Sequence, residues 1–380
     1  MTAVALPKQA TRRLSFGPWL WGGPFDLAVF GGSAALALVL VAIGHATGIS
    51  DHPLPEWGWV ALVLGVDVAH VYSTTFRTYF DREELARHPI RYWLVPLIVY
   101  GAGVVLYSAG AATFWRALAY VALFHFVRQQ VGWVAVYRAR GGNHARFDRV
   151  LDEVTVYAAT LYPVLYWHAH LHQTRFAWFV EGDFVDGGAA ALALLPTARL
   201  IWAASLIGFA LRQLQRVVQE GRLELGKSVV VATTAASWYV GIVATNSDFD
   251  FTVTNVIVHG VPYVALLFVY ARARRRENPD LLGSQIAAGG IGAFAGVLLL
   301  LAFVEEMAWD RLVWKDRSWL FGAGSLELTP VVLAFVVPLL ALPQAVHYVL
   351  DGVLWRRADT RARPAQRAAL GFDSTASPTG

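Results

Sequence analysis

Hydrophobic residues gather along this chain in ten stretches of about 20 residues, and polar residues separate one stretch from the next. A helix needs about 20 predominantly apolar residues to cross the hydrocarbon core of a bilayer. The pattern therefore predicts an all-α, polytopic integral membrane bundle of about ten transmembrane helices. The stretches lie at residues 26–46, 57–76, 92–110, 113–137, 150–168, 196–216, 228–246, 251–271, 286–304 and 329–354.

Charged residues are distributed unevenly between these stretches. The loops on one side are short or acidic, apart from the mixed loop 305–328. Basic residues mark the cytoplasmic side of membrane helices, so both termini are predicted to lie in the cytoplasm. Frequent Ala, Arg and Gly are typical of a bacterium with GC-rich DNA, which predicts a multi-pass protein of the bacterial inner (cytoplasmic) membrane. Lys and Arg gather in the ranges 8–13, 77–91, 138–149, 212–227, 272–276 and 356–363.

Three segments follow from this layout. They are a cytoplasmic N-terminal segment (1–25), a transmembrane helical domain (26–356) and a flexible cytoplasmic tail (357–380). Two longer loops, at about 168–190 and 305–328, carry several Trp and Phe residues, which predicts short helices lying in the membrane interface. Glu305 and Glu306 are then expected to end the ninth stretch at the outer surface.

Composition narrows the chemistry that this chain can perform. With 56% hydrophobic and 15% charged residues, the chain of 380 residues is too apolar for a soluble domain. The net charge of +4 is explained by the basic loops, so no nucleic-acid binding is predicted. The sequence has no cysteine, which excludes disulfides, thiolate metal sites, cysteine nucleophiles and c-type haem. Any metal ligands would have to be nitrogen or oxygen atoms.

Four of the hydrophobic stretches each carry one histidine at a similar depth. These histidines are His70, His125, His259 and His347, in the second, fourth, eighth and tenth stretches. All four stretches run in the same direction, and counting back from the next arginine places the imidazoles about 10 to 20 Å from the cytoplasmic boundary. Ionisable groups inside a membrane are costly and mark functional sites. The four histidines are therefore candidate ligands of one metal ion.

Other polar residues lie within one helical turn of these histidines and share their helix faces. Asp67 and Asp351 are predicted to be ligands or to orient the imidazoles, because a ligating histidine usually donates its other N–H to a carboxylate or carbonyl. Arg128 is predicted to pair with one of these carboxylates or to receive a substrate carboxylate or phosphate, and Gln129 to be polar within the same pocket. Each of these residues could equally make ordinary hydrogen bonds between helices.

Three or four neutral histidines with carboxylates and no sulfur suit non-haem iron, ahead of zinc, manganese or copper. An open coordination position in a dry pocket would allow oxygen chemistry on an apolar substrate. A b-type haem held by two of the histidines is a further interpretation of the same residues.

A second group of histidines lies close together in the sequence, at His168, His170 and His172. In a helix, His168 and His172 would be one turn apart and could bind Zn²⁺ together with Glu181 or Asp183. In an extended chain all three would share a face. Neighbouring Trp and Phe residues indicate an aromatic belt at the membrane interface instead.

The dispersed arrangement of His70, His125, His259 and His347, with the dipeptide His259-Gly260, weakly resembles the Brp/Blh-type membrane carotene dioxygenases. In that family, histidines on separate helices are thought to hold iron. The resemblance covers no continuous segment, and the clustered histidine boxes of fatty-acid desaturases are absent from these stretches. It implies a metal and a lipophilic substrate.

The sequence thus predicts a membrane-embedded, non-haem iron oxygenase or related oxidoreductase that acts on a lipophilic small molecule. Its partners would be this substrate and membrane lipid, and no protein partner is indicated. The alternative is a proton- or ion-coupled transporter that uses the same histidines and carboxylates. A transporter should have polar faces that reach both membrane surfaces, whereas an enzyme should have a closed polar cluster beside an apolar pocket.

Overall fold

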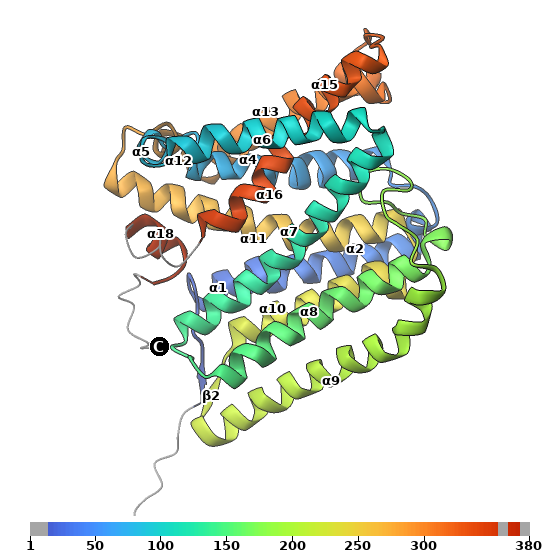
Figure 1. Cartoon of the computed structure of the whole chain (residues 1–380). Helices are drawn as coiled ribbons and strands as arrows, with labels where there is room; N and C mark the ends of the chain where they lie inside the picture. Colours follow the sequence, from blue (N-terminus) through green and yellow to red (C-terminus); the bar gives the residue numbers. More distant parts are fainter. Residues whose placement is uncertain (1–13, 356–363, 373–380) are drawn as a thin grey trace, which may run out of the picture.

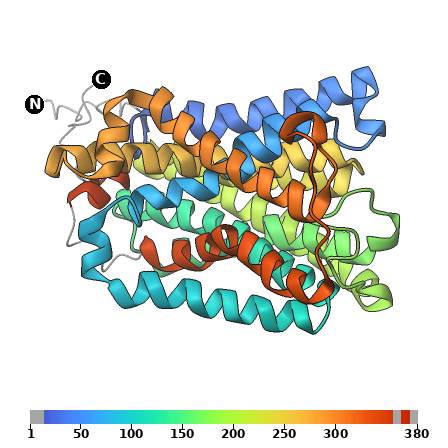
Figure 2. The ribbon, with the colours of Figure 1, turned by 90° about the horizontal axis from the view of Figure 1, so that it is seen from above.

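The computed structural model describes residues 14–355 and 364–372, and about 80% of the chain is helical. The predicted all-α class is confirmed. Long helices run side by side (Figures 1 and 2). All ten predicted stretches are helical, and they form the following elements: α1 (Gly23–Asp26), η1 (Leu27–Gly32) and α2 (Ser33–Thr47); α3 (Glu56–Gly58), η3 (Trp59–Val68), α4 (Ala69–Ser73) and η4 (Thr74–Arg77); α6 (Pro89–Ser108); α7 (Ala111–Arg140); α8 (Arg146–Ala169); α9 (Gly188–Glu220); α10 (Leu225–Trp238) and η6 (Tyr239–Ala244); α11 (Asp248–Glu277); α13 (Gly290–Trp309) and η7 (Asp310–Trp314); and α15 (Pro330–Leu340) and α16 (Leu342–Leu354).

The remaining elements are short. A two-residue parallel pair joins β1 (Ser15–Phe16) to β2 (Arg222–Leu223). The short helices are η2 (Ile49–Asp51), α5 (Arg82–Arg87), η5 (Leu171–Gln173), α12 (Leu282–Ala288), α14 (Ser318–Phe321) and α18 (Pro364–Ala369). We name the two ends of the bundle by what they carry. The loop end holds residues 170–187, and the arginine-rich end holds the last turns of α7 and α11 (Figure 1).

Seven helices of the described chain are long and apolar enough to cross a membrane, and there are eight if α15 and α16, bent by 41° at their junction, form one span. This is fewer than the ten spans predicted. The difference lies in α7, whose middle carries the polar residues His125, Arg128, Gln129 and Gln130, and in α8, which begins with several charged residues. Asp148 and Asp152 of α8, for example, are buried in salt bridges with Arg212, Arg216 and Lys227.

Helix α11 occupies the centre of the bundle and is buried along most of its length. It packs against α2, η3, α4, α10, α12 and α18. Ser247 caps its N-terminus by accepting a hydrogen bond from the N–H of Asp250, and three arginines, Arg274 to Arg276, lie in its last turn. Both features stabilise a helix, the cap through an otherwise unpaired N–H and the arginines through the helix dipole.

Gly260 allows α11 to approach η3 closely. A Cβ atom at this position would lie 2.8 Å from Val66 Cγ1 and 3.5 Å from His70 Cβ. Real carbon atoms do not come as close as 2.8 Å, so any larger residue would push the two helices apart. The smallest side chain thus brings His259, its neighbour in the sequence, beside His70.

Part of the predicted flexible tail (357–380) is ordered and buried. Residues 364–372 form α18 and the turn after it, and Gln366 and Ala369 are fully buried against the bundle. Gln366 accepts a hydrogen bond from Arg77 at 3.1 Å, and Trp21 Nε1 donates to the carbonyl of Ala369 at 2.7 Å. This stretch therefore belongs to the helical domain. The rest of the predicted tail lies outside the described residues, as do residues 1–13 of the predicted N-terminal segment.

The two longer loops differ from the prediction of interfacial helices. Their helices, η5 and α14, have three and four residues. Phe176 and Phe184 point inward and pack around Trp167, so these aromatic side chains form core and not a surface belt. In addition, the ninth stretch continues as helix through η7 to Trp314, ten residues beyond its predicted end at residue 304.

Candidate metal centre

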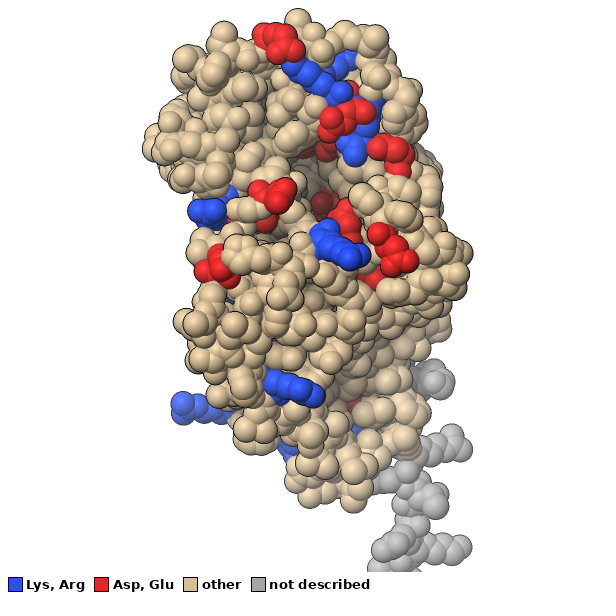
Figure 3. Space-filling view, turned by 90° about the vertical axis from the view of Figure 1, so that its right-hand side faces the viewer, with Lys and Arg blue, Asp and Glu red and all other residues tan. Residues whose placement is uncertain are grey.

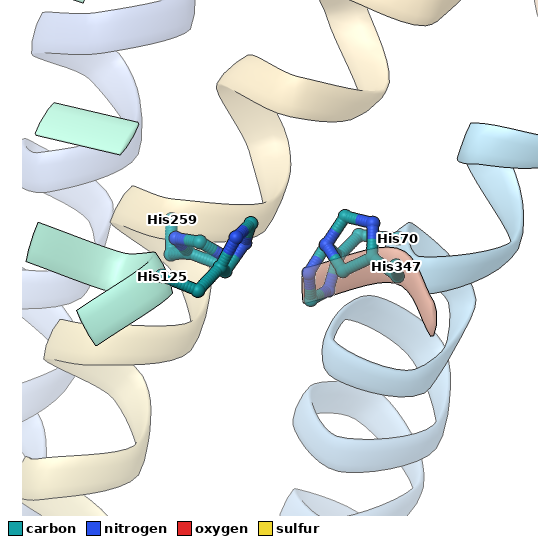
Figure 4. Close-up of side chains that lie close together, drawn as sticks. All are labelled: His70, His125, His259 and His347. Carbon is teal, nitrogen blue, oxygen red and sulfur yellow. The ribbon is translucent and has the colours of Figure 1, made fainter. Parts of the chain in front are cut away.

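The four histidines predicted from the sequence come together in the interior of the bundle (Figure 4). His70 comes from α4, His125 from α7, His259 from α11 and His347 from α16, and all four side chains are buried. They form a closed ring in which each imidazole neighbours two others. Around the ring, from His70 to His259, His125, His347 and back to His70, the centroid distances are 4.8, 5.0, 4.7 and 5.1 Å. We call this group the histidine ring.

The histidine ring has the donor atoms that a metal ion requires. One ligand nitrogen from each histidine can be chosen such that all four lie within 4.8 Å of one another. Six of the eight ring nitrogens have no hydrogen-bond partner among the described residues. An unpartnered buried polar group costs about 1–3 kcal/mol, so six together would cost as much as the whole folding free energy of a typical protein, about 5–15 kcal/mol. An ion bound by four imidazoles would engage four of these nitrogens.

Thr74 fixes the orientation of His347. Its Oγ1 lies 2.7 Å from His347 Nδ1 and 3.1 Å from the hydroxyl of Tyr263. If Nε2 of His347 is the metal ligand, Nδ1 carries the proton and donates it to Thr74. Such a partner sets the tautomer and the ring plane of a ligating histidine. Thr74 follows His70 by four residues in the sequence, but its contact is with the histidine of another helix.

The two predicted carboxylates each lie beside one histidine. Asp67 Oδ1 is 3.7 Å from His70 Nδ1, and Asp351 Oδ2 is 3.6 Å from His125 Nδ1. Both distances exceed a normal hydrogen bond, so the carboxylates are neighbours that a small movement would bring into contact. Asp351 was expected to act on His347 of its own helix, and the structure places it beside His125 of α7 instead.

Gln129 and Phe126 hold His259 from the side of α7. Gln129 Nε2 donates a hydrogen bond to the backbone carbonyl of His259 at 2.9 Å. The ring of Phe126 stacks on the imidazole of His259, with 3.5 Å between centroids and 7° between planes. Gln129 thus contacts the histidine ring through the backbone of one of its members.

Arg128 does not form the ion pair predicted for it. Its side chain is exposed, and Nη1 donates to the hydroxyl of Tyr157 at 2.6 Å. Since Gln129 faces the ring, its neighbour Arg128 is turned about 100° around the helix. The predicted pairing of Arg128 with Asp67 or Asp351 is not present in the described residues.

His168, His170 and His172 do not converge. The Nδ1 atoms of His168 and His170 each lie within 2.8 Å of a backbone carbonyl one turn earlier in α8, and His168 Nε2 lies 2.9 Å from Tyr120. His172 pairs with Asp186 at 2.9 Å on the surface. The backbone N–H of Gly188 also donates to Asp186 and, with His172, lowers the pKa of this carboxyl. Within the described chain, only the histidine ring has the geometry of a metal site.

A large cavity leads from the loop end toward the histidine ring. It has a volume of about 1230 Å³, and Figure 3 looks onto its mouth, where carboxylates surround a hollow. Its inner wall includes Asp67, Asn255 and Gln344, each one helical turn from a ring histidine, together with Phe126. The cavity therefore ends beside the ring.

Several residues of this region were not assigned to the site from the sequence. Glu305 and Glu306 line the cavity because α13 continues past them, whereas the sequence placed them at the surface. Phe126 and Tyr263 were not singled out at all. The one sequence signal for Phe126 and Tyr263 is their spacing of one and four residues from ring histidines, which many core residues share.

No family model, no curated protein and no solved structure matches this chain.

Proposed function

We propose that this protein is a membrane-embedded oxidoreductase that binds one non-haem metal ion, most suitably iron, in the histidine ring. The observation that carries this proposal is the convergence of four buried histidines from four helices, with one ligand nitrogen each within 4.8 Å. Such a group stays buried at low cost only when its nitrogens are engaged. Bound iron would supply redox chemistry with dioxygen.

The donor set suits iron, zinc or copper, and it argues against magnesium and calcium. All four ligands are imidazoles, and carboxylates stand nearby as a further source of oxygen ligands. Imidazole suits iron, zinc and copper, whereas sites built for magnesium or calcium use oxygen atoms alone. Haem b is disfavoured by the spacing, because imidazole centroids of 4.7–5.1 Å leave no flat slot for a macrocycle in the middle of the ring.

The residues around the ring have separable roles in this proposal. Thr74 would hold His347 in one tautomer, and Gln129 would anchor the backbone of His259. Phe126 covers one face of His259 and would limit the access of water to the ring. Asp67 and Asp351 are placed to orient His70 and His125 or to hold a proton close to them.

The proposed setting is the cytoplasmic membrane of a bacterium, with ten helices crossing it and both termini in the cytoplasm. Seven or eight helices meet the length and composition required, and α7 and α8 would cross as charged helices covered by their neighbours. The substrate would be a lipophilic small molecule. The resemblance to Brp/Blh-type dioxygenases is proposed for metal and substrate class only, not for carotene cleavage.

A transporter is the alternative, and the cavity favours the enzyme over it. Residues from the loop end and the middle of the bundle line this cavity, and none of its lining comes from the arginine-rich end. The cavity at the arginine-rich end that lies beside Tyr270 and Arg274 has a volume of only about 70 Å³. A site reached from one end only suits an enzyme.

The test is to purify the protein in detergent without oxygen and to measure iron, zinc, manganese and copper by elemental analysis. We expect close to one iron per chain, and its loss in His125→Ala and His347→Ala. Nitric oxide, a probe of open positions on ferrous iron, should then give a new paramagnetic resonance signal in the wild-type protein.

His144→Ala, in an exposed turn at the arginine-rich end, is the matched control and should keep its iron. Circular dichroism establishes that each variant is still helical. Folded wild-type protein without any metal would overturn the proposal. Iron that does not bind nitric oxide would point to a structural ion and would contradict the oxidoreductase function.

A further inference from the structure

The cavity above the histidine ring is rich in carboxylates and poor in cations. It is lined by nine Asp and Glu side chains but by only three arginines, Arg116, Arg175 and Arg317. Arg317 is already engaged, because it pairs with Glu56 at 3.1 Å and lies over the ring of Trp59 at 3.8 Å. The cavity therefore has more carboxylates than cationic side chains to offer a ligand.

Several of these carboxylates have partners in the protein. Asp248 accepts a hydrogen bond from the N–H of Leu54, and Asp183 accepts bonds from two backbone N–H groups of its own loop. Asp186 pairs with His172. These three groups maintain the fold around the cavity and need no ligand.

Asp67, Glu305 and Glu306 are different. Within residues 14–355 and 364–372, none of the three forms a salt bridge with Lys or Arg. Glu305 accepts a long hydrogen bond of 3.3 Å from Trp309 Nε1, its second oxygen is buried without a hydrogen bond of normal geometry, and the hydroxyl of Tyr72 is its other polar neighbour. Carboxylates in such a setting call for a positive charge or a hydrogen-bond donor.

Asn255 also lacks a hydrogen-bond donor, independently of the carboxylates. Its side chain is 5% exposed and lines the inner wall of the cavity. Its Nδ2 donates to the carbonyl of Phe251 at 3.0 Å, which leaves Oδ1 as an acceptor with no partner in the described chain. Acceptors from three elements, η3, α11 and α13, thus line the cavity.

Much of the remaining lining is aromatic. Trp115, Trp309 and Trp314 lie in mutual contact with ring centroids 5.5–5.8 Å apart, and Trp59 and Trp178 also line the cavity. Aromatic faces attract cations, and organic ammonium groups are recognised in cages of such rings. A bare metal ion would gain little from them, and a volume of about 1230 Å³ is far larger than it needs.

We propose that this cavity binds an organic ammonium ligand, with its charged nitrogen at Asp67, Glu305, Glu306 and the Oδ1 of Asn255 and its apolar part against the tryptophans. As the substrate of the proposed metal centre, it would be an amphiphilic amine, an assignment that rests on the proposed function. Binding itself does not depend on a metal. The carbon atoms next to the ammonium group would lie closest to the histidine ring.

The test compares two water-soluble probes of the same shape, 2-phenylethylammonium and 2-phenylethanol. Binding is measured by calorimetry on protein in nanodiscs of uncharged lipid, before and after removal of metal, and in His125→Ala. We expect the ammonium to bind about tenfold or more tightly than the alcohol in all three samples, because only the charged probe satisfies the carboxylates.

Variants locate the binding site. Glu305→Gln/Glu306→Gln should weaken ammonium binding about tenfold, and Asn255→Leu should weaken it less, because it removes one neutral acceptor. Glu327→Gln removes an exposed carboxylate outside the cavity lining and should change nothing. Mn²⁺ is added as a competing inorganic cation.

Equal binding of the ammonium and the alcohol would overturn the proposal, as would unchanged binding in Glu305→Gln/Glu306→Gln. Binding of Mn²⁺ at these carboxylates without any binding of the ammonium would also overturn it, in favour of an ion site. Ammonium binding in protein that holds no metal would support the cavity proposal while the proposed metal function fails. Iron in the ring without ammonium binding would support the metal function and overturn the cavity proposal.

Discussion

Two groups of histidines in this molecule have opposite relations to the sequence. His168, His170 and His172 are packed into five residues, yet each finds a separate local partner. The members of the histidine ring come from four helices spread over most of the chain, yet they meet in one ring. Proximity in the sequence thus says little about a metal site of this kind, and equal depth in the bundle says much more.

The difference has a simple physical cause. Near the end of α8, backbone carbonyls, a tyrosine and an aspartate are within reach of the imidazoles, so their nitrogens are satisfied. In the middle of the bundle, backbone groups are used up by the helices themselves, and apart from the contact of His347 with Thr74 the ring nitrogens find no normal hydrogen bond in the described residues. The histidine ring differs from the second group by its nitrogen atoms without hydrogen-bond partners, and not by the number of histidines close together in the sequence.

The largest expected effect tests the comparison of the two histidine groups directly. His70→Ala or His259→Ala should lower the metal content from about one ion per chain to background, because either change removes one of four ligands. The triple variant His168→Ala/His170→Ala/His172→Ala should keep its metal. Elemental analysis of the purified proteins measures both. Loss of metal in the triple variant, with the ring variants unaffected, would reverse our assignment of the two groups.

A smaller effect is expected from the group that orients His347. Thr74→Val keeps the shape of the side chain but removes the hydroxyl that contacts Nδ1. Loss of such a partner lowers metal affinity about 10- to 100-fold. Affinity is measured by competition with a chelator of known strength. Thr74→Ser restores the hydroxyl and should recover most of the affinity, whereas a purely steric role for Thr74 would leave the serine variant as weak as the valine variant.

Gly260→Ala tests the close approach of α11 to η3. The added carbon would lie 2.8 Å from Val66 Cγ1, so the helices must move apart next to His70 and His259. Overpacking of this kind costs about 1–3 kcal/mol, and metal affinity should fall with stability. The readouts are thermal unfolding and chelator competition. Gly132→Ala on α7, where the added carbon meets no atom within 4 Å, is the control. Identical behaviour of the two variants would mean that the contact at Gly260 is unimportant.

The smallest expected effect concerns Asp186 and its partner His172 at the loop end, and it appears at acid pH. The N–H of Gly188 and the contact with His172 hold the pKa of Asp186 below its usual range. A carboxyl whose pKa is lower in the folded state stabilises the fold above its unfolded pKa of about 3.9, and this contribution is lost as pH falls further. Backbone exchange in residues 171–187, corrected for its intrinsic pH dependence, should therefore quicken between about pH 5 and pH 3.

Asp186→Asn should abolish this acid response and leave the metal content unchanged. An acid response that persists in the asparagine variant would assign it to another group. The metal content of the histidine ring should not depend on this substitution, because Asp186 and His172 make no contact with the ring.

The sequence predicted the helical class, the ten helical stretches and the four histidines, because hydropathy and depth are set by local composition. The partners of the histidines were harder to predict. Asp351 was expected beside His347 but lies beside His125, and Thr74, four residues after His70 in the sequence, contacts His347. These contacts depend on the rotation of each helix about its axis, which packing between helices determines and spacing within one helix does not.

The acidic residues of α13 illustrate a second limit. Hydropathy falls at Glu305 and Glu306, so the sequence predicted the end of a span there. The helix continues because its next turns, through Trp309 and Trp314, pack against Trp115. Aromatic packing between distant segments thus converts two surface carboxylates into the wall of a cavity. Arg128 is the opposite case. A charged residue within an apolar stretch was expected to face the interior of the bundle, and its side chain is exposed.

The order in which the ring members occur in the chain has a consequence for biosynthesis. Thr74 and its partner His347 are separated by 273 residues, and His347 lies in the last of the long helices. At about 5–20 residues per second, the ribosome needs roughly 14 to 55 s to make that segment. His125 and His259 are made within this interval, so three histidines are present without the fourth while residues 260 to 347 are being added. An ion can be enclosed by the complete ring only after α16 has been made, so metal loading would be a late event in the life of each new chain.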